Sequence, residues 1–489
     1  MFFKIKKRNL ELMDTISEML KVLSRLNDPM IAVSDCIAAT EIILTQLNQE
    51  ETIPQKTIEH LKSIHASFEE FSNNYSLINE ESTKMLNDQV IFLKAIFDEE
   101  IKAKLNIVFF PYKASMWDSM ATVYEAAAID NDCIARVIPI PYYELSQDKA
   151  TPVYEGDRFP QGVPITHYSQ YALEQDQPDI IFIHNIYDEY NTLTRVHEKY
   201  FSSNLKKFTD MLVYVPYHVS SFISPKKGDR RMAYSLPTVG NVDKIIVAGD
   251  YLKTAAIRDG IPEEKILALG SPKLDALVNA LKKDVSYPDE WKKKIEGKTV
   301  YLLNTGCMFF ATQTFLRISN LANFLNIANI NKTNVVIWRP HPLTKASILK
   351  YTPHIMEYYN HLTERFIKQK EFGVYNNIIL DETDDYLPAL KAADVLVSGD
   401  GSLLRSYLIA EKKVLFLDKE MPEGSLIPSD AFYYFYNEDE PWHELVKKFS
   451  QGYDPLAENR KGMAAKVYAN TDGTCGEKVY QTIKECVLS

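Results

Sequence analysis

Two short stretches of the second half decide the fold and the site: Trp338-Arg-Pro-His-Pro342 and Val397-Ser-Gly-Asp-Gly-Ser402. Each follows a short apolar run, at residues 335–338 and 395–397, of the kind that forms a buried parallel strand. Loops that follow parallel strands gather at the carboxyl edge of an open α/β sheet, where ligands bind. The two stretches therefore predict one ligand site, built from an arginine–histidine turn and a loop of small residues.

The bulk composition is typical of a globular protein with more than one domain. A chain of 489 residues exceeds what one core usually supports, and 46% hydrophobic with 25% charged residues is ordinary. The formal net charge of -11 argues against nucleic acid as a partner, because phosphate contacts need dense lysine and arginine. Five scattered cysteines form no CxxC pair, which favours a reduced, cytoplasmic setting. We expect no membrane span and no signal peptide, because the apolar runs fall short of roughly 18–20 residues.

Residues 1–100 are expected to form an α-helical N-terminal region. Apolar residues recur there at helical spacing, the region has only two prolines, and it contains no glycine. Three or four amphipathic helices in a small bundle would account for this pattern. Residues 1–8 mix apolar and basic side chains, which leaves two alternatives open. They bind a membrane surface peripherally, or they pack on the body or on a second copy of the chain in a homo-oligomer.

From residue 106 the periodicity changes to short β-branched or aromatic runs separated by helical stretches. This alternation predicts parallel sheets covered by helices, with the strands at 107–110, 135–140, 179–184, 211–215, 244–248 and 266–269, and then at 299–304, 335–338, 377–380, 395–398 and 414–417. Residues 282–298 are charged and form the best linker. We therefore predict two doubly wound parallel-sheet domains facing a cleft, at 101–285 and 286–489, and a long loop at 142–171 on the ligand edge.

The donor side of the predicted cleft carries phosphate-binding chemistry. Arg339 and His341 can donate to phosphate oxygens, and the prolines beside them stiffen the turn. Ser398, Asp400, Gly401 and Ser402 open a helix at 403–411, where Ser402 can cap the helix or meet a phosphate. Asp400 would repel phosphate, so it is expected to accept a hydroxyl or order the loop. Lys273 and Thr305 complete the donor-binding candidates.

The acceptor side is expected on the first sheet. His218 follows the strand at 211–215 and is a candidate general base for an acceptor hydroxyl. His184, Asn185 and Asp188 end the preceding strand and form a polar patch suited to an acceptor. The sequence has no GxxxxGK[ST] loop, no GxGxxG fingerprint, no HExxH and no GxSxG elbow, and we expect neither a catalytic metal nor a cofactor.

Three segments together resemble the CDP-glycerol glycerophosphotransferases, the teichoic-acid primases and polymerases. The family carries an RPHP turn, a Ser-Asp-Tyr-Ser-Ser-like loop and a Gly-x-Pro-Arg-x-Asp segment, and this chain has similar residues at 339–342, 398–402 and 270–275. The resemblance covers about residues 210–420. Lys273 stands where the family has arginine, His218-Val219 where it has His-Gly, and Gly399-Asp400-Gly401-Ser402 where it has Asp-Tyr and a serine pair.

This resemblance implies a GT-B-like fold and a transferase. The implied donor is CDP-glycerol or a related nucleotide-activated polyol, and the implied acceptor is a glycan or lipid-linked hydroxyl in teichoic-acid or cell-wall synthesis, on the inner face of the membrane. CMP would leave, His218 would take the acceptor proton, and His341 with Arg339 would hold the phosphates.

Two alternatives stay open. One is a glycosyltransferase or nucleotide-sugar epimerase of the same architecture, and the other is a non-catalytic scaffold that keeps the fold.

Overall fold

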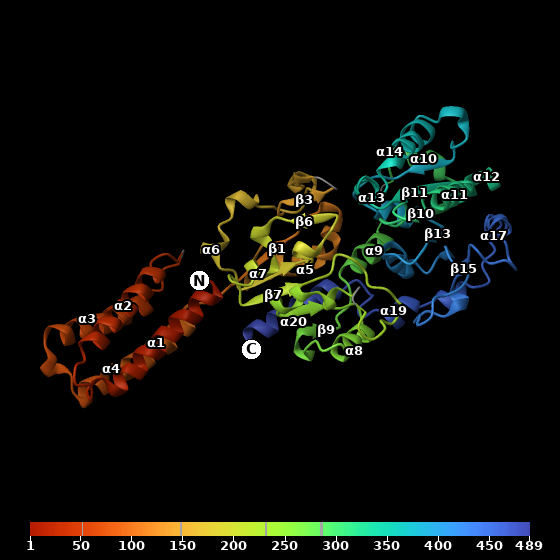
Figure 1. Ribbon diagram of the computed structural model, residues 1–489. Helices are drawn as coiled ribbons and strands as arrows, with labels where there is room; N and C mark the ends of the chain where they lie inside the picture. The colour runs from red at the N-terminus through yellow and green to blue at the C-terminus, as the bar shows by residue number, and fades with distance from the viewer. Residues whose placement is uncertain (51, 147–148, 230–231, 284–286) are drawn as a thin grey trace. The chain divides into compact units, whose positions relative to one another are not determined.

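The computed structural model describes residues 1–489 except 51, 147–148, 230–231 and 284–286 (Figure 1). The chain divides into two compact units. The first comprises Met1–Asn106 with Asp130–Ile134, and the second comprises Ile107–Ile129 with Ala135–Ser489. The predicted boundary between residues 285 and 286 lies outside the described residues.

The first unit is a bundle of four helices, as the spacing of apolar residues predicted. They are α1 (Phe3–Leu23), α2 (Met30–Leu47), α3 (Gln55–Asn73) and α4 (Glu80–Glu100). Their apolar faces form one core, in which Met13, Leu61 and Phe97 are almost fully buried. Asn79 starts α4 through a capping box with Ser82, which satisfies two orphan N–H groups. The helices therefore bury the apolar residues whose spacing predicted them.

Helix α2 bears on the expectation that the chain has no membrane span. Met30–Leu47 has 18 residues with a mean hydropathy of 1.5, and by length and composition it could cross one. Of its residues, 33% are buried, and these pack against the neighbouring helices of the bundle. The core helix of a bundle meets the same criterion.

The first sheet of the second unit is parallel, in the order β2-β1-β5-β7-β8-β9. Its strands are β1 (Leu105–Phe110), β2 (Cys133–Val137), β5 (Ile180–Ile183), β7 (Met211–Tyr214), β8 (Lys244–Ile246) and β9 (Ile266–Leu267). Both faces are apolar; on one of them Phe109 of β1 stacks on Phe182 of β5 with ring centroids 4.8 Å apart. The order of strands changes direction between β1 and β5, so the carboxyl ends of these two strands open a crevice.

The segment at 142–171 is not the single long loop that its polar and aromatic residues predicted. Its described residues include two strands of an antiparallel sheet, β4-β3-β6, made of β3 (Tyr142–Leu145), β4 (Ala150–Val153) and β6 (Thr194–Val196). Tyr142 pairs with Val153 on one side and with Val196 on the other. These strands have three or four residues each, and β4 is mostly exposed, so they lack the continuous apolar run that marks a buried strand.

The second sheet is parallel in the order β12-β11-β10-β13-β14-β15, with its change of direction between β10 and β13. Its strands are β10 (Thr299–Thr305), β11 (Asn334–Pro340), β12 (Ile378–Leu380), β13 (Val395–Ser398), β14 (Lys413–Phe416) and β15 (Tyr433–Tyr434). Successive side chains of β10 point into two different cores, with Leu302 in one and Leu303 in the other. Helices thus cover both faces, as expected for a doubly wound sheet.

Helices connect the strands and join the two sheets. They are α5 (Ala121–Ala128), α6 (Leu173–Asp176), α7 (Ser202–Leu205), α8 (Asp250–Arg258), α9 (Lys273–Lys282), α10 (Asp289–Ile295), α11 (Thr314–Leu325), α12 (Ile327–Ile330), α13 (Thr344–Tyr351), α14 (Met356–Asn360), α15 (Leu387–Ala392), α16 (Ser402–Tyr407), α17 (Trp442–Phe449), α18 (Ala457–Arg460), α19 (Met463–Val467) and α20 (Cys475–Leu488). Helix α9 packs on α5, beside the first sheet, and on α15 and α16, beside the second.

The C-terminal helix α20 returns to the first sheet, where it packs on α5. Asp275 of α9 is fully buried and holds this helix, because its carboxylate accepts from the backbone N–H groups of Cys475 (3.2 Å) and Gly476 (2.8 Å) and from the Thr122 hydroxyl (2.9 Å). The predicted fold class is confirmed: an α/β, GT-B-like chain with two doubly wound parallel sheets, preceded by a helical region.

Candidate functional site

The two motifs that opened the sequence converge on the second sheet. Thr305 ends β10, Arg339 lies one residue from the end of β11, and Ser398 ends β13. These three strands are neighbours, and the switch in strand order falls between β10 and β13. The backbone N–H of His341 donates to the Thr305 carbonyl at 3.0 Å, which fixes the arginine–histidine turn beside this switch point. Open α/β sheets bind their ligands at such a switch point, beyond the carboxyl ends of the strands.

The loop after β13 contacts the loop after β7 of the first sheet. The Ser402 hydroxyl accepts from the Val219 backbone N–H at 3.1 Å, and Arg405 donates to the Val219 carbonyl at 2.8 Å. The Asp400 carboxylate accepts from the Ser221 hydroxyl (2.8 Å) and from Arg405 (2.8 Å). Asp400 therefore orders the loop and is neutralised by Arg405, in agreement with the expectation that it would accept a hydroxyl.

His218 lies at this contact between the two sheets and is held in neutral form. Burial, together with the positive charges of Arg405 and Lys273, lowers the pKa of its imidazole to about 4. Among the residues that the structure describes, no side chain or backbone group hydrogen-bonds its ring nitrogens. A neutral imidazole with no protein partner can accept a proton from a bound hydroxyl.

His341 is also neutral, and its tautomer follows from one contact. Burial lowers its pKa to about 4, with Lys273, Lys113 and Arg339 contributing repulsion. The Leu343 backbone N–H donates to Nδ1 of the ring at 3.1 Å, so Nδ1 carries no proton. The neutral ring must then carry its proton on Nε2. His341 is accordingly a hydrogen-bond donor through Nε2 and is not a base in this state.

Arg339 has partners other than the phosphate that the sequence predicted for it. Arg339 is 5% exposed, and its guanidinium pairs with Asp381 at 2.5 Å and donates to the Thr383 carbonyl at 2.7 Å. The guanidinium also donates hydrogen bonds to the backbone carbonyls of Asp384 and Asp385. These contacts give Arg339 the role of shaping the loop between β12 and α15, and a phosphate contact would require that network to open.

Lys273 is nearly buried and bridges the two sheets together with Asp118. Its ammonium lies 3.0 Å from the Asp118 carboxylate and 4.7 Å from the centre of the Tyr386 ring. The Tyr386 hydroxyl donates to the same carboxylate at 2.5 Å. Asp118 follows β1, and Tyr386 follows β12, so this cluster connects loops of both sheets. The positive charge of Lys273 is thus partly neutralised, which weakens it as a phosphate ligand.

The three acceptor candidates that follow β5 are held by the fold itself. His184 is fully buried, its Nε2 accepts from the Tyr112 N–H at 3.1 Å, and burial lowers its pKa to about 3. Asp188 accepts from the N–H (2.9 Å) and hydroxyl (2.6 Å) of Ser202, and burial raises its pKa to about 6. Asn185 accepts from the Tyr187 N–H at 2.9 Å, and its amide nitrogen has no partner among the described residues.

The remaining donor candidates also have internal contacts. Thr305 is buried and accepts from the Trp338 indole at 3.2 Å, and Ser398 donates to the Gly399 carbonyl at 2.9 Å. Gly401 leaves space beside Asn304, whose amide oxygen would lie 3.8 Å from an added Cβ. Of the predicted donor residues, Ser402 and Asp400 are the ones whose side chains contact the loop that carries His218.

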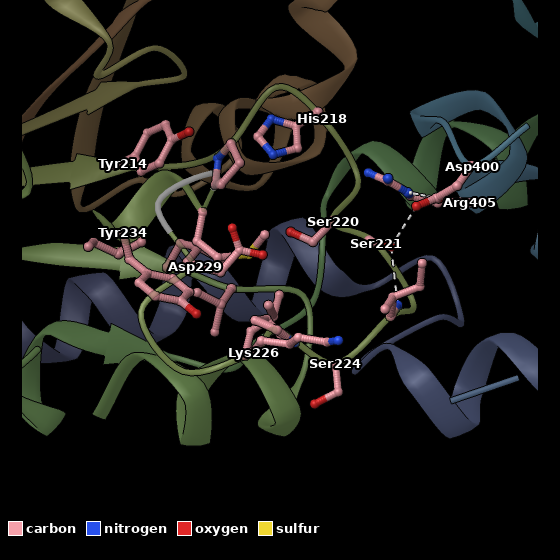
Figure 2. A pocket seen from close by; sticks show the side chains of 18 of the residues that line it. Tyr214, His218, Ser220, Ser221, Ser224, Lys226, Asp229, Tyr234, Asp400 and Arg405 are labelled. Carbon is pink, nitrogen blue, oxygen red and sulfur yellow. Dashed lines mark hydrogen bonds and ion pairs between the residues drawn. The ribbon is translucent and has the colours of Figure 1, made fainter. Parts of the chain in front are cut away.

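A cavity of about 430 Å³ opens beside His218 (Figure 2). Tyr214 and Tyr234 lie at one end of the view, Asp400 and Arg405 at the other, and Ser220 and Ser221 lie between them. The backbone of this loop is held from outside, because the Tyr468 hydroxyl donates to the Ser220 carbonyl at 3.0 Å and Tyr251 donates to that of Ser221. The cavity has the size of small-molecule sites, roughly 300–1,000 Å³.

Sequence reasoning missed Arg405, Ser221 and Tyr234. Arg405 lies in α16, the helix that begins at Ser402, and a cation three residues beyond a loop expected to bind anions was a usable signal. Ser221 and Tyr234 gave no such signal, because only the folded chain brings them to the cavity. Over the ranges that the structure describes, no three His, Cys, Asp or Glu side chains are grouped so that they could hold a metal ion.

Protein-family models and curated proteins give no match to this chain. Solved structures do resemble it. A putative UDP-N-acetylglucosamine 2-epimerase from Listeria monocytogenes is 14% identical, with 78% of this chain and 97% of that chain covered and a TM-score of 0.47. UDP-GlcNAc 2-epimerase from Methanocaldococcus jannaschii, solved with UDP-GlcNAc and UDP, is 14% identical. The match covers 78% of this chain and 99% of that chain, with a TM-score of 0.48. A variant of the wall teichoic acid polymerase TagF is 15% identical, and the match covers 78% of this chain and 89% of that chain, with a TM-score of 0.48. The likeness concerns the fold alone.

Proposed function

We propose that this chain is a transferase that moves a glycerol-phosphate, or similar polyol-phosphate, group from a CDP-activated donor to an acceptor hydroxyl. One observation carries the proposal. A neutral, partnerless histidine of the first sheet, His218, lies beside a cavity where the switch-point loop of the second sheet contacts its own loop through Ser402. A base and a nucleotide-binding edge are the two elements that such a transfer needs.

The reaction proceeds by displacement at phosphorus. His218 takes the proton of the acceptor hydroxyl, and the freed oxygen forms a bond to the phosphorus of the glycerol-phosphate group. The bond from that phosphorus to the bridging oxygen of the donor breaks, and CMP leaves with the bond's electron pair. The proton passes from His218 to solvent.

On the donor side, His341 donates through Nε2 to the leaving phosphate, and the small residues Ser398, Gly401 and Ser402 let backbone N–H groups approach it. Such preorganised donors stabilise developing charge by several kcal/mol. Thr305 positions the turn from within, and Arg339 holds the loop at 381–385, which closes this side of the site. Lys273 acts with Asp118 as a fixed charge near both histidines.

On the acceptor side, His184, Asn185 and Asp188 shape the loops around the switch point of the first sheet. We assign residues 101–285 to the acceptor-side domain and 286–489 to the donor-side domain, with α20 returning to pack on α5. We place the protein at the inner face of the membrane, with residues 1–8 as the contact and a glycan or lipid-linked molecule as acceptor. Liposome flotation of a chain lacking those residues tests this: unchanged flotation rejects the contact.

The decisive experiment measures nucleotide release from CDP-glycerol and, in parallel, interconversion or hydrolysis of UDP-GlcNAc. We expect CMP from CDP-glycerol, and a loss of about 10²–10⁴-fold in rate for His218→Ala, the range for a general base. Tyr407→Phe, a buried substitution outside the site, is the matched control. Turnover of UDP-GlcNAc without CMP release would indicate the epimerase or glycosyltransferase alternative. Absence of turnover with every donor would indicate the scaffold.

A further inference from the structure

The donor edge of the second sheet is closed in this structure. The residues predicted to meet the donor there are almost fully buried: Thr305 and Ser398 are 1% exposed, and Arg339 is 5% exposed. The cavity beside His218 gives no access to them, because none of these three residues belongs to its lining. A nucleotide can therefore reach this edge only after a contact that covers it has opened.

The antiparallel sheet covers the two segments that flank the arginine–histidine turn. Its strands β3, β4 and β6, with the turn at residues 154–158, are here called the strap. On one flank, β3 packs on α13, the helix that follows the turn, and Lys350 of α13 donates to the Thr192 carbonyl just before β6. On the other flank, Arg158 donates to both carboxylate oxygens of Asp384, at 2.9 and 2.6 Å. Asp384 lies in the loop whose carbonyls hold the arginine of the turn.

The strap is attached to the first sheet by buried contacts. Glu155 is 4% exposed, and its carboxylate accepts from the Tyr142 hydroxyl (2.6 Å), the Ala114 N–H (2.9 Å) and the Lys113 ammonium (3.3 Å). The segment that leads into β3 continues along β1, where the Ile138 N–H donates to a carbonyl of that strand at 2.9 Å. Separating a buried, hydrogen-bonded charge pair is costly, so the strap stays with the first sheet.

The contact of the strap with the second sheet is exposed and easily broken. The side chains of Arg158 and Asp384 are 53% and 41% exposed, and ion pairs of this kind contribute little to stability. Tyr386, two residues further along the same loop, donates one hydrogen bond to Asp118 of the first sheet. If that bond also breaks, Lys273 at 3.0 Å still compensates the charge of Asp118. The strap can therefore separate from the loop at residues 381–386 without leaving a carboxylate unpaired in the interior.

A backbone bridge joins the two sheets elsewhere and would keep them together during this separation. The Ser224 N–H donates to the Gly424 carbonyl at 2.9 Å, and the Leu426 N–H donates to the Phe222 carbonyl at 2.9 Å. These bonds flank an antiparallel bridge between residues 223 and 425. Paired backbone groups do not depend on exposed side chains, so we expect the strap contact to open first.

We infer that the strap is an autoinhibitory contact: it keeps the donor edge closed, and a nucleotide binds only when the pair of Arg158 and Asp384 separates. The movement of the strap is independent of what the protein binds, whereas its effect on donor binding rests on the proposed function. A ligand that binds only the open form has an apparent Kd that is raised in proportion to the scarcity of that form. Weakening the pair should therefore tighten nucleotide binding.

Nucleotide affinity is measured with the full chain by calorimetric titration of CMP, CDP-glycerol, UDP and UDP-GlcNAc. Arg158→Ala should lower the Kd of each probe that binds by about two- to fivefold, the factor by which an exposed ion pair shifts an equilibrium. Exchange of the two charges, Arg158→Asp with Asp384→Arg, should restore the wild-type Kd. Arg365→Ala is the matched control, because it removes a similar two-bond pair with Glu371, at 2.7 Å each, away from the strap.

Opening itself is measured by pulsed dipolar EPR, which needs no ligand. Spin labels are attached to cysteines at Thr151 of β4 and Glu357 of α14, both exposed. The background carries Cys307→Ser and Cys486→Ser, which removes the two partly exposed native cysteines. Arg158→Ala should raise the population at longer distance by the same two- to fivefold factor as it lowers the Kd.

The two readouts separate the strap from the proposed function. Unchanged or weaker nucleotide binding by Arg158→Ala, or an unchanged distance distribution in that variant, would overturn the inference. If no probe binds to any variant while the longer distance becomes more populated, the proposed function is refuted, and the strap remains a movable element without a regulatory role. Release of CMP from CDP-glycerol, with neither affinity nor distance altered by Arg158→Ala, would refute the strap and leave the proposed function standing.

Discussion

Acidification should destabilise this protein through the three histidines that lie around the site. Burial holds His184, His218 and His341 in the neutral form, with pKa values of about 3, 4 and 4. In the unfolded chain a histidine titrates near 6.5. Below that pH the unfolded state binds protons that the folded state does not, so the stabilisation is complete above pH 6.5 and is lost as the pH falls from 6.5 towards 4.

The size of the effect follows from the shifts. A histidine that titrates at about 4 when folded and about 6.5 when unfolded loses about 2 kcal/mol of stabilisation between pH 7 and pH 5. Three such groups would together remove about 5–6 kcal/mol, which is comparable to the whole stability of many domains. At pH 5.5 each of them should take up about 0.9 proton on unfolding.

Proton uptake is the appropriate readout, because it needs no assumption that a chain with two compact units unfolds in one step. Folded protein in weakly buffered solution at pH 5.5 is mixed with concentrated urea, and the acid needed to restore the pH is titrated. Single variants His184→Asn, His218→Asn and His341→Asn should each lower the uptake by about 0.9 proton. Carboxyl groups contribute equally to all samples, so the differences isolate the histidines.

His443→Asn provides the matched substitution, since that histidine is about half exposed, at 48%. If the three site variants take up as many protons as the wild type, the imidazoles are already charged in the folded protein. That result would refute the neutral state of His218 and, with it, its readiness to act as a base. It would also remove the tautomer argument for His341.

Three further predictions concern contacts that hold the site. Asp275→Ala removes the acceptor for two N–H groups at the start of α20, and it should cost about 2–4 kcal/mol, seen as faster amide exchange in α20 alone; unchanged exchange would contradict it. Arg339→Ala leaves the Asp381 carboxylate buried without its counter-ion, so the urea midpoint should fall by the equivalent of about 3–5 kcal/mol. Arg158→Ala breaks a pair with Asp384 whose side chains are 53% and 41% exposed, and its effect on the same midpoint should stay below about 1 kcal/mol.

The parallel sheets could be predicted from the sequence because their strands are buried on both faces. Runs such as 335–338 and 395–397 are continuously apolar, and each of the predicted runs forms a strand of β10 to β14 or of the first sheet. Strands β3, β4 and β15 could not be predicted in this way. They have two to four residues each, and β4 is almost entirely solvent-facing, so packing against neighbours, and not periodicity, determines them.

The convergence of the two motifs could also be predicted, because strand ends of a parallel sheet share one edge. The partners of individual side chains could not. The guanidinium of Arg339 is directed by the carbonyls of residues 383–385, which lie more than forty positions away, and backbone carbonyls leave no mark in a sequence. Likewise, nothing in the sequence connects Lys273 with Asp118, which lies 155 positions away.

Two of the points where this chain departs from the family it resembles lie together in the folded protein. Val219 and Asp400 each differ from the family's pattern, whereas Ser402 matches the second residue of its serine pair, and the sequence presents the two changes as unrelated. In the structure the Val219 N–H donates to Ser402, its carbonyl accepts from Arg405, and Arg405 in turn pairs with Asp400. The negative charge of Asp400, which would repel a donor phosphate, is therefore balanced by Arg405 of the helix that follows it. The two departures therefore meet, through Ser402 and Arg405, in one hydrogen-bonded contact beside the cavity, which only the folded chain brings together.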